Sequence, residues 1–421
     1  MLATAVLAQA AGTVFQSAPA FLIPLLHTQQ GIPLAQAGLL ASAPTLGLVL
    51  TLVAWGALTD RVGERWVIAA GMALTALAAA GAIAVVTAGS GYVGLGAFLL
   101  LGGAASASTN VASGRVVVGW FRKERRGLAM GIRQMCQPLG VAVAAVAIPP
   151  LARSGGIPAA MALPMVLTGV LAVVSAVVIV DPPRPKRADD GAGASRPVNP
   201  YRGSATLVRI HAASALLVVP QFTVSIFGLV WLTTDRGMNE TAAGIVIGVS
   251  QFVGALGRVA VGVLSDRVGS RLRPLRWVAW LAAAVMLALA FGDLVPAWAA
   301  AALLIVAATV TVADNGLAYT AVAELAGPFW SGRALGAQNT GQFLAASIVG
   351  PAVGGLITIV GFPFAFALVA LAPVVAVPLV PRDPREAGED QSAATQIAEA
   401  ATAPSVTGGA PSIETTTSPA N

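Results

Sequence analysis

The segment GALTDRVGER (residues 56–65) recurs 206 residues later in the chain as GVLSDRVGSR (262–271). The same offset aligns Gly31 with Gly237 without a gap, so the match extends over the apolar stretch that precedes each segment. Each copy is a short charged segment between two long apolar runs. The chain is therefore predicted to consist of two related halves.

Polar residues inside the later apolar runs repeat as well. After one net deletion the offset becomes 205, and it aligns Asn110 with Asn315, Gln134 with Asn339, and Gln137 with Gln342. Polar side chains within membrane-spanning segments are costly and often mark substrate pathways. Their symmetric recurrence favours a shared functional layer over isolated packing contacts.

The composition places the chain in a lipid bilayer. Of its 421 residues, 57% are hydrophobic and 10% are charged, which is more apolar surface than one soluble core can bury. A single cysteine, Cys136, and two distant histidines exclude a disulfide framework and a Cys/His metal site, and we expect no cofactor. We also expect no nucleic-acid binding, because the basic residues lie between the apolar segments rather than on one patch.

Twelve apolar runs are long enough to cross about 30 Å of hydrocarbon as helices. They span approximately 2–26, 34–58, 66–87, 91–118, 127–151, 157–180, 206–232, 241–265, 275–293, 296–323, 334–358 and 361–380. The predicted fold is an all-α integral membrane protein with twelve transmembrane helices in two pseudo-symmetric six-helix bundles. We expect residues 1–26 to form a retained helix rather than a signal peptide, because they lack a basic leading region and have a counterpart in the second half.

Basic residues are unevenly distributed between the two sides of the predicted bundle. With the N-terminus in the cytoplasm, twenty of the 24 Lys and Arg residues fall in the even-numbered connections, at the helix ends beside them or in the C-terminal tail, and only Arg153 and Arg236 fall on the other side. Because positively charged loops stay in the cytoplasm, both termini are predicted to be cytoplasmic, in the cytoplasmic membrane. The remaining two, Arg133 and Arg258, fall deeper within predicted helices.

The predicted domain organisation follows from this pattern. We expect six-helix bundles at residues 1–180 and 206–380. The segment 181–205 is rich in Pro, Gly and charge and is predicted to be a cytoplasmic linker. Residues 381–421 have no apolar periodicity and are predicted to be a disordered cytoplasmic tail.

The doubled pattern G-x-x-x-D-R-x-G-x-R, between helices 2 and 3 and again between helices 8 and 9, resembles the major facilitator superfamily. The resemblance covers roughly residues 1–380. It implies two bundles that rock around a central site near the middle of the membrane. Helices 1, 4, 7 and 10 would then line the cavity.

The resemblance also implies a gate at the repeated loops. Asp60 would help to hold the cytoplasmic side closed by meeting a helix N-terminus and nearby arginines. The candidate gating residues are Asp60, Arg61, Gly63, Arg65, Asp266, Arg267 and Gly269. Glu64 departs from the family, which usually has a basic residue there, so the charge balance of this gate is expected to differ. The alternative interpretation is a solvated loop without a gating role.

Depth along the predicted helices brings the polar residues to one layer. At 1.5 Å per residue, Gln137 and Asn110 each lie about 15 Å from the cytoplasmic helix ends, and Arg133 lies about 9 Å from them. The candidate substrate-binding residues are Asn110, Arg133, Gln134, Gln137, Asn315, Gln338, Asn339 and Gln342. The alternatives are hydrogen bonding between helices for the amides and, for Arg133, extension of the side chain to the cytoplasmic surface.

Asp314 is the only acidic residue predicted near the middle of the membrane. An ionised carboxylate there needs a partner, and either Arg258 or Arg133 could supply it. We predict that Asp314 binds the coupling proton. If its partner is Arg133, an anion bound to that arginine would weaken its hold on Asp314 and so link the two bindings.

These features predict a secondary transporter and not an enzyme. The sequence contains no Walker motif and no nucleophile elbow, so ATP-driven pumping is not expected. An arginine facing amides favours an anionic or polyhydroxylated small substrate. The predicted function is proton-coupled uptake, or symport, of a small organic anion by a monomer in the bilayer.

Two alternatives are kept. One is an exporter that exchanges a drug or metabolite for protons; the G-x-x-x-G-P-x-x-G-G pattern of such antiporters is usually on helix 5, whereas here the near-match ASIVGPAVGG (346–355) is on helix 11. The other is a transport-inactive sensor or receptor with the same fold, which the short linker and tail disfavour.

Overall fold

The computed structural model describes residues 1–182, 199–202 and 204–382. Met1–Pro381 forms one compact unit. Most of the predicted linker (181–205) and nearly all of the predicted tail (381–421) lie outside the described residues.

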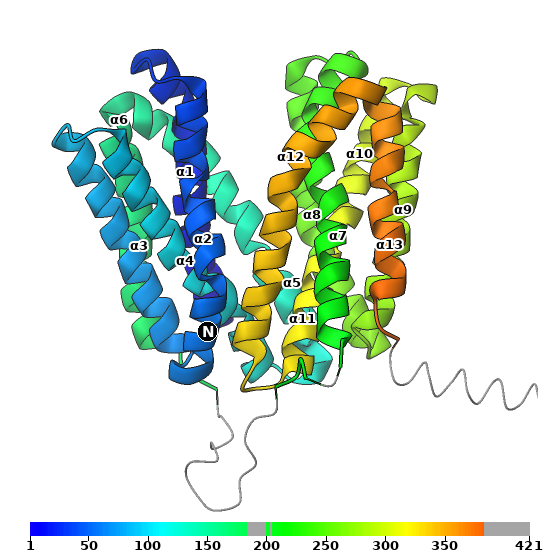
Figure 1. Cartoon of the computed structure of the whole chain (residues 1–421), viewed down its shortest axis with the longest axis horizontal. Coiled ribbons are helices and arrows are strands. Elements are labelled where there is room, and N and C mark those ends of the chain that lie inside the picture. Colours follow the sequence, from blue (N-terminus) through cyan, green and yellow to red (C-terminus); the bar gives the residue numbers. More distant parts are fainter. Residues whose placement is uncertain (183–198, 203, 383–421) are drawn as a thin grey trace, which may run out of the picture. The chain divides into compact units, whose positions relative to one another are not determined.

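The described part of the first half contains six α-helices, and Figure 1 colours them in the order of the sequence. They are α1 (Leu2–Pro24), α2 (Leu34–Val62), α3 (Glu64–Thr87), α4 (Tyr92–Trp120), α5 (Arg126–Arg133) and α6 (Cys136–Val178). The backbone of α6 is non-helical at Gly155 and Gly156, where the chain passes from one membrane crossing to the next. Gly156 has a φ of 67°, which glycine adopts without steric cost.

The described part of the second half contains seven α-helices. They are α7 (Thr206–Val230), α8 (Glu240–Val268), α9 (Leu272–Ala290), α10 (Ala297–Thr311), α11 (Asp314–Ala326), α12 (Ser331–Val369) and α13 (Leu371–Leu379). The backbone of α12 is non-helical at Gly361, which separates two crossings in the same way as Gly155 and Gly156 do in α6.

Twelve membrane crossings result. Ten helical stretches within the described residues are long and apolar enough to span a membrane. Two of them, Lys123–Val178 and Ser331–Leu379, are 56 and 49 residues long and contain the glycine bends, so each crosses twice. The part of the chain that the structure describes contains no β-strand, and the predicted all-α fold with twelve transmembrane helices is confirmed.

Two crossings are broken in a way that the apolar pattern did not predict. The fifth crossing is interrupted at Gln134 and Met135, between α5 and α6, and the tenth is interrupted at Val312 and Ala313, between α10 and α11. Broken membrane helices expose backbone polar groups, which must be satisfied by protein or face a cavity. Both breaks lie close to the polar site described below.

The two halves meet through glycines at the end of the unit that carries the N-terminus and the two repeated loops, which we call the closed end. A Cβ atom added to Gly56 of α2 would lie 2.3 Å from the carbonyl oxygen of Gly332 of α12. A Cβ atom added to Gly127 of α5 would lie 2.2 Å from the carbonyl oxygen of Gly262 of α8. Only glycine permits backbones to approach so closely, so these two pairs form a pseudo-symmetric glycine seam.

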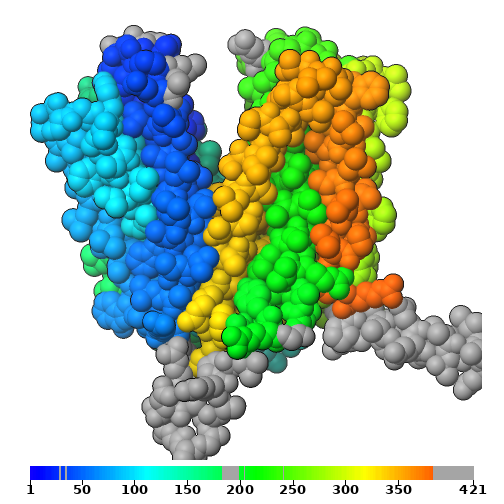
Figure 2. Space-filling view, viewed as in Figure 1, coloured from blue at the N-terminus to red at the C-terminus, as the bar shows by residue number. Residues whose placement is uncertain are grey.

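The opposite end, which we call the distal end, is differently arranged. A Cβ atom added to Gly38 of α2 or to Gly244 of α8 would meet no atom within 4 Å. The space-filling view shows a cleft between the first and second halves of Met1–Pro381 at this end (Figure 2). The same two helices are therefore tightly packed at the closed end and loosely surrounded at the distal end.

Candidate functional site

A polar cavity of about 50 Å³ lies between the two halves. Four primary amides from each half line it: Gln9, Asn110, Gln134 and Gln137 from the first, and Gln221, Asn315, Asn339 and Gln342 from the second. Its other walls are Arg258, Tyr319, Val218, Phe222 and Phe343. Six of the eight predicted substrate-binding residues thus share one cavity, with Arg133 and Gln338 outside its lining.

In the first half the amides are held by a short hydrogen-bond chain. The Gln9 amide of α1 donates to Asn110 Oδ1 of α4 at 2.8 Å, and Ser113 Oγ donates to Gln9 Oε1 at 2.8 Å. Gln9 and Asn110 are both buried. The chain fixes the orientation of these two amides toward the cavity.

The second half also holds its amides in a hydrogen-bond chain, which is centred on Asn315, the residue aligned with Asn110, but uses partners at other positions. The Gln342 amide of α12 donates to Asn315 Oδ1 of α11 at 2.9 Å and to Ser214 Oγ of α7 at 2.8 Å. The Asn315 amide donates to Gln221 Oε1 at 3.0 Å. Both halves therefore present pre-oriented amides, which can donate and accept hydrogen bonds.

Arg133 is enclosed behind the cavity wall. It lies at the end of α5, is 1% exposed, and donates from Nε to Ser113 Oγ, from Nη1 to Gln134 Oε1 and from Nη2 to Asn110 O, at 2.9, 2.9 and 2.6 Å. Its guanidinium carbon lies 5.2 Å from the ring centre of Tyr319 in the second half. The extension to the membrane surface that was considered for this arginine does not occur.

Arg258 of α8 has fewer partners and lines the cavity directly. Its Nη1 donates to the carbonyl oxygen of Gln134 at 2.9 Å, while its buried Nε has no hydrogen-bond partner among the described residues. The side chain is 8% exposed. Arg258 also borders a smaller adjoining cavity with Ser225 and Ser250.

Asp314 lies at the first residue of α11, immediately after the break in the tenth crossing. It is 1% exposed, and neither carboxylate oxygen has a hydrogen-bond partner in the described part of the chain. Of the two candidate partners, Arg258 is the arginine with which it interacts electrostatically. The carboxylate is thus behind the wall of the site rather than in it.

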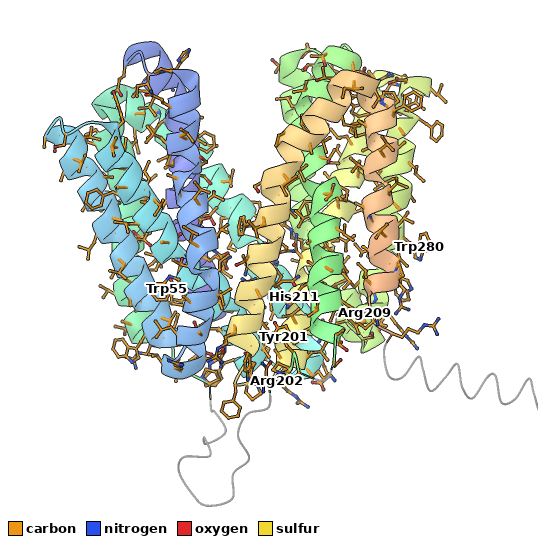
Figure 3. All side chains as sticks on the ribbon, in the orientation of Figure 1. Trp55, Tyr201, Arg202, Arg209, His211 and Trp280 are labelled. Atoms are coloured by element: carbon orange, nitrogen blue, oxygen red, sulfur yellow. The ribbon has the colours of Figure 1, made fainter. Side chains whose placement is uncertain are left out.

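Gln338 is directed away from the cavity, toward the closed end. His211 Nδ1 donates to Gln338 Oε1, and Tyr201 Oη lies 3.0 Å from His211 Nε2. Figure 3 shows His211 above Tyr201 beside the lower part of α7. His211 and Gln338 therefore join α7 to α12, and a substrate role for Gln338 has no geometric support.

At the closed end, the Asp60 carboxylate caps a helix of the other half. It accepts hydrogen bonds from the backbone N–H groups of Gly332 and Arg333, at 2.8 and 3.1 Å, in the first turn of α12. Arg115 Nη1 donates to it at 2.6 Å, and Arg115 Nε lies 3.0 Å from Glu64 Oε1. Asp60, Glu64 and Arg115 are all buried. The unusual acid at position 64 is therefore matched by an arginine of α4.

Asp266 makes the pseudo-symmetric cap. Its two oxygens accept from the backbone N–H groups of Gly127 and Leu128, at 2.9 and 2.8 Å, at the start of α5. Arg271 Nη1 donates to Asp266 at 2.6 Å, and Arg271 Nη2 lies 3.7 Å from Glu324. Each repeated loop thus holds the N-terminus of a helix in the opposite half, where a carboxylate is favoured by the helix dipole.

The other predicted gating residues surround these caps. Gly63 and Gly269 follow the ends of α2 and α8 with φ angles of 117° and 68°, a region that favours glycine. Arg61 and Arg267 are exposed, and Arg65 bonds within its own half. Direct contact with the opposite half is thus made by the two aspartates of this set.

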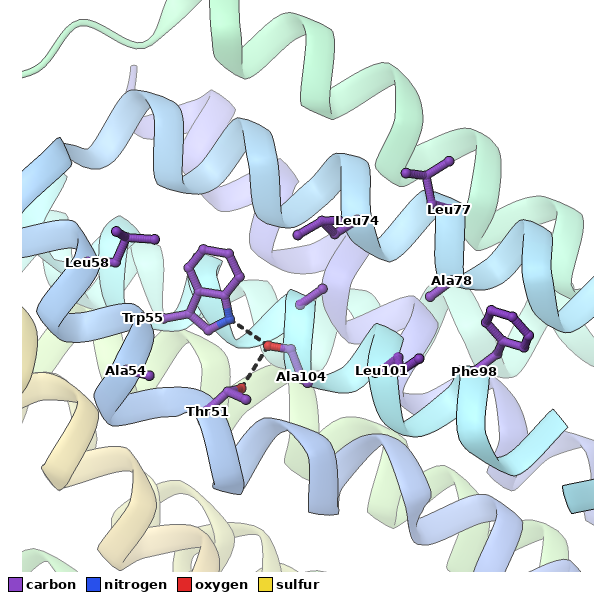
Figure 4. Close-up of a pocket in the computed structure, with 11 residues that line it drawn as sticks. Thr51, Ala54, Trp55, Leu58, Leu74, Leu77, Ala78, Phe98, Leu101 and Ala104 are labelled. Atoms are coloured by element: carbon purple, nitrogen blue, oxygen red, sulfur yellow. Dashed lines mark hydrogen bonds between the residues drawn. The ribbon is translucent and has the colours of Figure 1, made fainter. Parts of the chain in front are cut away.

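A larger cavity, of about 530 Å³, is apolar and belongs to the first half alone. It lies among α2, α3 and α4, with Leu77 and Phe98 in its wall (Figure 4). Thr51 Oγ1 and Trp55 Nε1 both donate to the carbonyl oxygen of Ala104, at 2.8 and 2.7 Å, so these polar groups are already paired. This cavity does not suit a polar solute.

Apart from Arg258, three polar residues of the cavity lining were not among the predicted site residues. Gln9 and Gln221 interrupt apolar runs on α1 and α7, and a polar residue inside such a run is the signal that could have identified them. Tyr319 carried no such signal, because a tyrosine in a membrane helix is usually explained by packing or by the interface.

The chain matches the family described as Major Facilitator Superfamily over residues 5–349, and it therefore belongs to this superfamily of membrane transporters. It is 50% identical over 372 residues to an uncharacterized MFS-type transporter of Mycobacterium tuberculosis, an alignment that covers 88% of this chain and 82% of the relative. The chain is accordingly a multi-pass membrane transporter.

Solved structures share its fold. A bacterial homologue of the iron transporter ferroportin in an outward-facing state has a TM-score of 0.72 and 14% identity, covering 90% of this chain and 98% of that one. The transporter FucP in an outward conformation has a TM-score of 0.71 and 16% identity, covering 90% and 97%. At these identities the likeness concerns the fold.

Proposed function

We propose that the protein takes up a small, hydroxylated organic anion across the cytoplasmic membrane together with protons. The observation that carries this proposal is the polar cavity, in which eight amides and one arginine face a space between the two halves. Drug-sized ligands are usually bound in larger, mainly apolar pockets. The amide-rich wall instead favours a solute with several hydrogen-bonding groups.

The closed end is proposed to face the cytoplasm. The predicted cytoplasmic loops, with most of the basic residues, are at this end, in line with the retention of positive loops inside. The distal cleft would then open to the outside, so that the structure corresponds to the state that receives external substrate (Figure 2). Release inside would require the glycine seam and the Asp60 and Asp266 caps to separate.

Asp314 is the proposed proton site. Burial without hydrogen-bond partners disfavours the ionised carboxylate, and the positive field of Arg258 favours it. An anion that neutralises Arg258 would remove the second effect, and binding of anion and proton would then support each other. This coupling needs no direct contact between substrate and Asp314.

Uptake into reconstituted vesicles tests the proposal. The purified protein should accumulate labelled hydroxycarboxylates, such as glycerate or gluconate, when the outside is made acidic relative to the inside, and a protonophore should abolish the accumulation. Efflux driven by the same gradient, or uptake that ignores the gradient, would contradict the proposed direction or coupling.

A further inference from the structure

We infer that Arg258, rather than Arg133, binds the anionic group of the substrate, and that the substrate does so by replacing the carbonyl of Gln134 as the arginine's partner. The inference rests on the proposed transport of an anion and assigns both a residue and a consequence to its binding. Because Arg258 and Gln134 belong to different halves, the replacement breaks a link between them.

The two arginines differ in how many of their N–H donors are already hydrogen-bonded. A guanidinium has five N–H donors, and Arg133 uses all three of its nitrogens on Ser113, Gln134 and Asn110. Arg258 has a buried, unpartnered Nε and borders the cavity. A carboxylate entering the cavity therefore meets the Arg258 guanidinium, which has one hydrogen bond among the described residues, whereas reaching Arg133 would require breaking bonds inside the first half.

The Gln134 carbonyl is free to accept a hydrogen bond from Arg258 because of a proline. In a continuous helix the carbonyl of Gln134 would accept from the N–H group four residues later, but that residue is Pro138, which has none. The helix is interrupted at this point, and Arg258 Nη1 of the second half donates to the free carbonyl at 2.9 Å. The break in the fifth crossing thus creates a binding site for Arg258.

A substrate carboxylate is the stronger acceptor. The bond from Arg258 to the Gln134 carbonyl has a charged donor and a neutral acceptor, whereas a carboxylate also brings the opposite charge and can bind the planar guanidinium through two parallel bonds. The neutral Gln134 carbonyl offers a single acceptor atom. We therefore expect an anion in the cavity to replace the Gln134 carbonyl as the hydrogen-bond partner of Arg258.

The link lies next to the glycine seam. A Cβ atom added to Gly131 of α5 would be 2.7 Å from the carbonyl oxygen of Arg258, so the two backbones already touch one turn before the break. Release of Arg258 from Gln134 removes a hydrogen bond that lies next to this backbone contact, three residues after Gly131. Substrate binding would in this way promote the opening of the closed end.

The test uses the accessibility of a single thiol. Cys136 is the only cysteine, so Cys136→Ala provides a background in which Ala334→Cys, fully buried in the core cluster at the closed end, reports opening. In inverted vesicles without substrate, Arg258→Gln should raise the rate of labelling by a membrane-impermeant maleimide at least fivefold. Arg153→Gln, which removes the same charge from an exposed position, is the matched control and should leave the rate unchanged. A rate for Arg258→Gln equal to that of the control would overturn the link.

A second variant leaves the arginine in place. Pro138→Ala restores an N–H donor for the Gln134 carbonyl, so it should displace Arg258 and raise labelling even if Arg258→Gln folds poorly. Folding is checked by the elution profile in detergent. A well-folded Pro138→Ala protein that labels like its parent would count against the proposed exchange.

The anion assignment is tested with glycerate and gluconate, with glycerol as the neutral control. Either anion should raise labelling of the reporter protein, glycerol should not, and Arg258→Gln should abolish the response. A response that persists in Arg258→Gln, or no response of the reporter protein to either anion, would overturn the assignment. Labelling needs no proton gradient, so a failure of proton-driven uptake is recognised separately.

Discussion

Arg133 and Arg258 show that two arginines inside the same membrane region can have different roles. The first is surrounded by acceptors of its own half, and the second has one acceptor from the opposite half. Both fall within predicted membrane helices, and both have the same side-chain chemistry. Their partners depend on rotation about the helix axes and on side-chain packing, which the apolar pattern does not determine.

The structural role of Arg133 can be tested by replacing it with lysine. Arg133→Lys loses the fork that reaches Ser113, Gln134 and Asn110 together. Because hydrogen bonds to charged groups contribute about 1.5–3 kcal/mol each, the free energy of unfolding should fall by about 2 kcal/mol or more, seen as a lower melting temperature in detergent. The KM of the folded fraction should change little. A steep rise in KM at an unchanged melting temperature would instead place Arg133 in contact with substrate.

The two gating aspartates, Asp60 and Asp266, should also differ in how much each contributes to transport and to thermal stability. The Asp60 side chain is fully buried and paired with Arg115, whereas the Asp266 side chain is 9% exposed beside Arg271. Asp60→Asn leaves a buried arginine without its full counter-charge, a change that costs about 3–5 kcal/mol when a buried pair is broken. We expect it to reduce transport and thermal stability more than Asp266→Asn does. Equal, negligible effects on both measurements would show that the caps do not hold the closed end.

At the scale of elements, the glycine seam gives a sharper prediction. The atom facing Gly56 is a backbone oxygen at 2.3 Å from the added Cβ, so it cannot rotate away as a flexible side chain would. Overpacking of this kind costs about 1–3 kcal/mol, and Gly56→Ala should shift the protein away from the closed arrangement. Labelling of the Ala334→Cys reporter should rise by about tenfold, which corresponds to about 1.4 kcal/mol.

Its pseudo-symmetric counterpart and a control follow from the same geometry. Gly262→Ala should act like Gly56→Ala, because Gly262 faces the Gly127 carbonyl oxygen at 2.2 Å. Gly244→Ala, on the same helix α8, introduces a methyl group into open space and should leave labelling unchanged. Similar labelling in all three variants would show that the seam is not what limits opening.

The helices also show which parts of the structure could be predicted from the sequence. Apolar length and the internal repeat determine how many crossings there are and at what depth each residue lies, and six candidate residues accordingly line the cavity. Which side of a helix faces the cavity depends on tertiary packing, and Gln338, predicted for the same layer, lies outside the cavity lining and bonds to His211. The break after Arg133 had a local signal in Pro138, whereas the break at Val312 had none.

At the scale of the whole molecule, the two halves have equivalent caps at the closed end but different charged residues near the polar cavity. Both repeated loops cap a helix of the opposite half, and both halves supply four amides. The residues aligned with Arg258 and Asp314 are Leu52 and Thr109, which carry no charge. A duplicated fold has thus kept a common mechanism of opening, and the groups proposed for anion and proton binding are in the second half.

This asymmetry makes Asp314 the place to test coupling. Asp314→Asn is a fixed mimic of the protonated carboxyl group, and it removes a buried charge without leaving Arg133 or the amide network unpaired. We expect it to abolish accumulation driven by an imposed pH difference, because no proton can bind or leave, while exchange of internal for external substrate continues at a measurable rate. Thr109→Ala, at the equivalent position of the first half, should retain accumulation. If Asp314→Asn still concentrates substrate in response to the pH difference, the carboxylate serves as a structural counter-charge to Arg258, and the proton must be carried elsewhere.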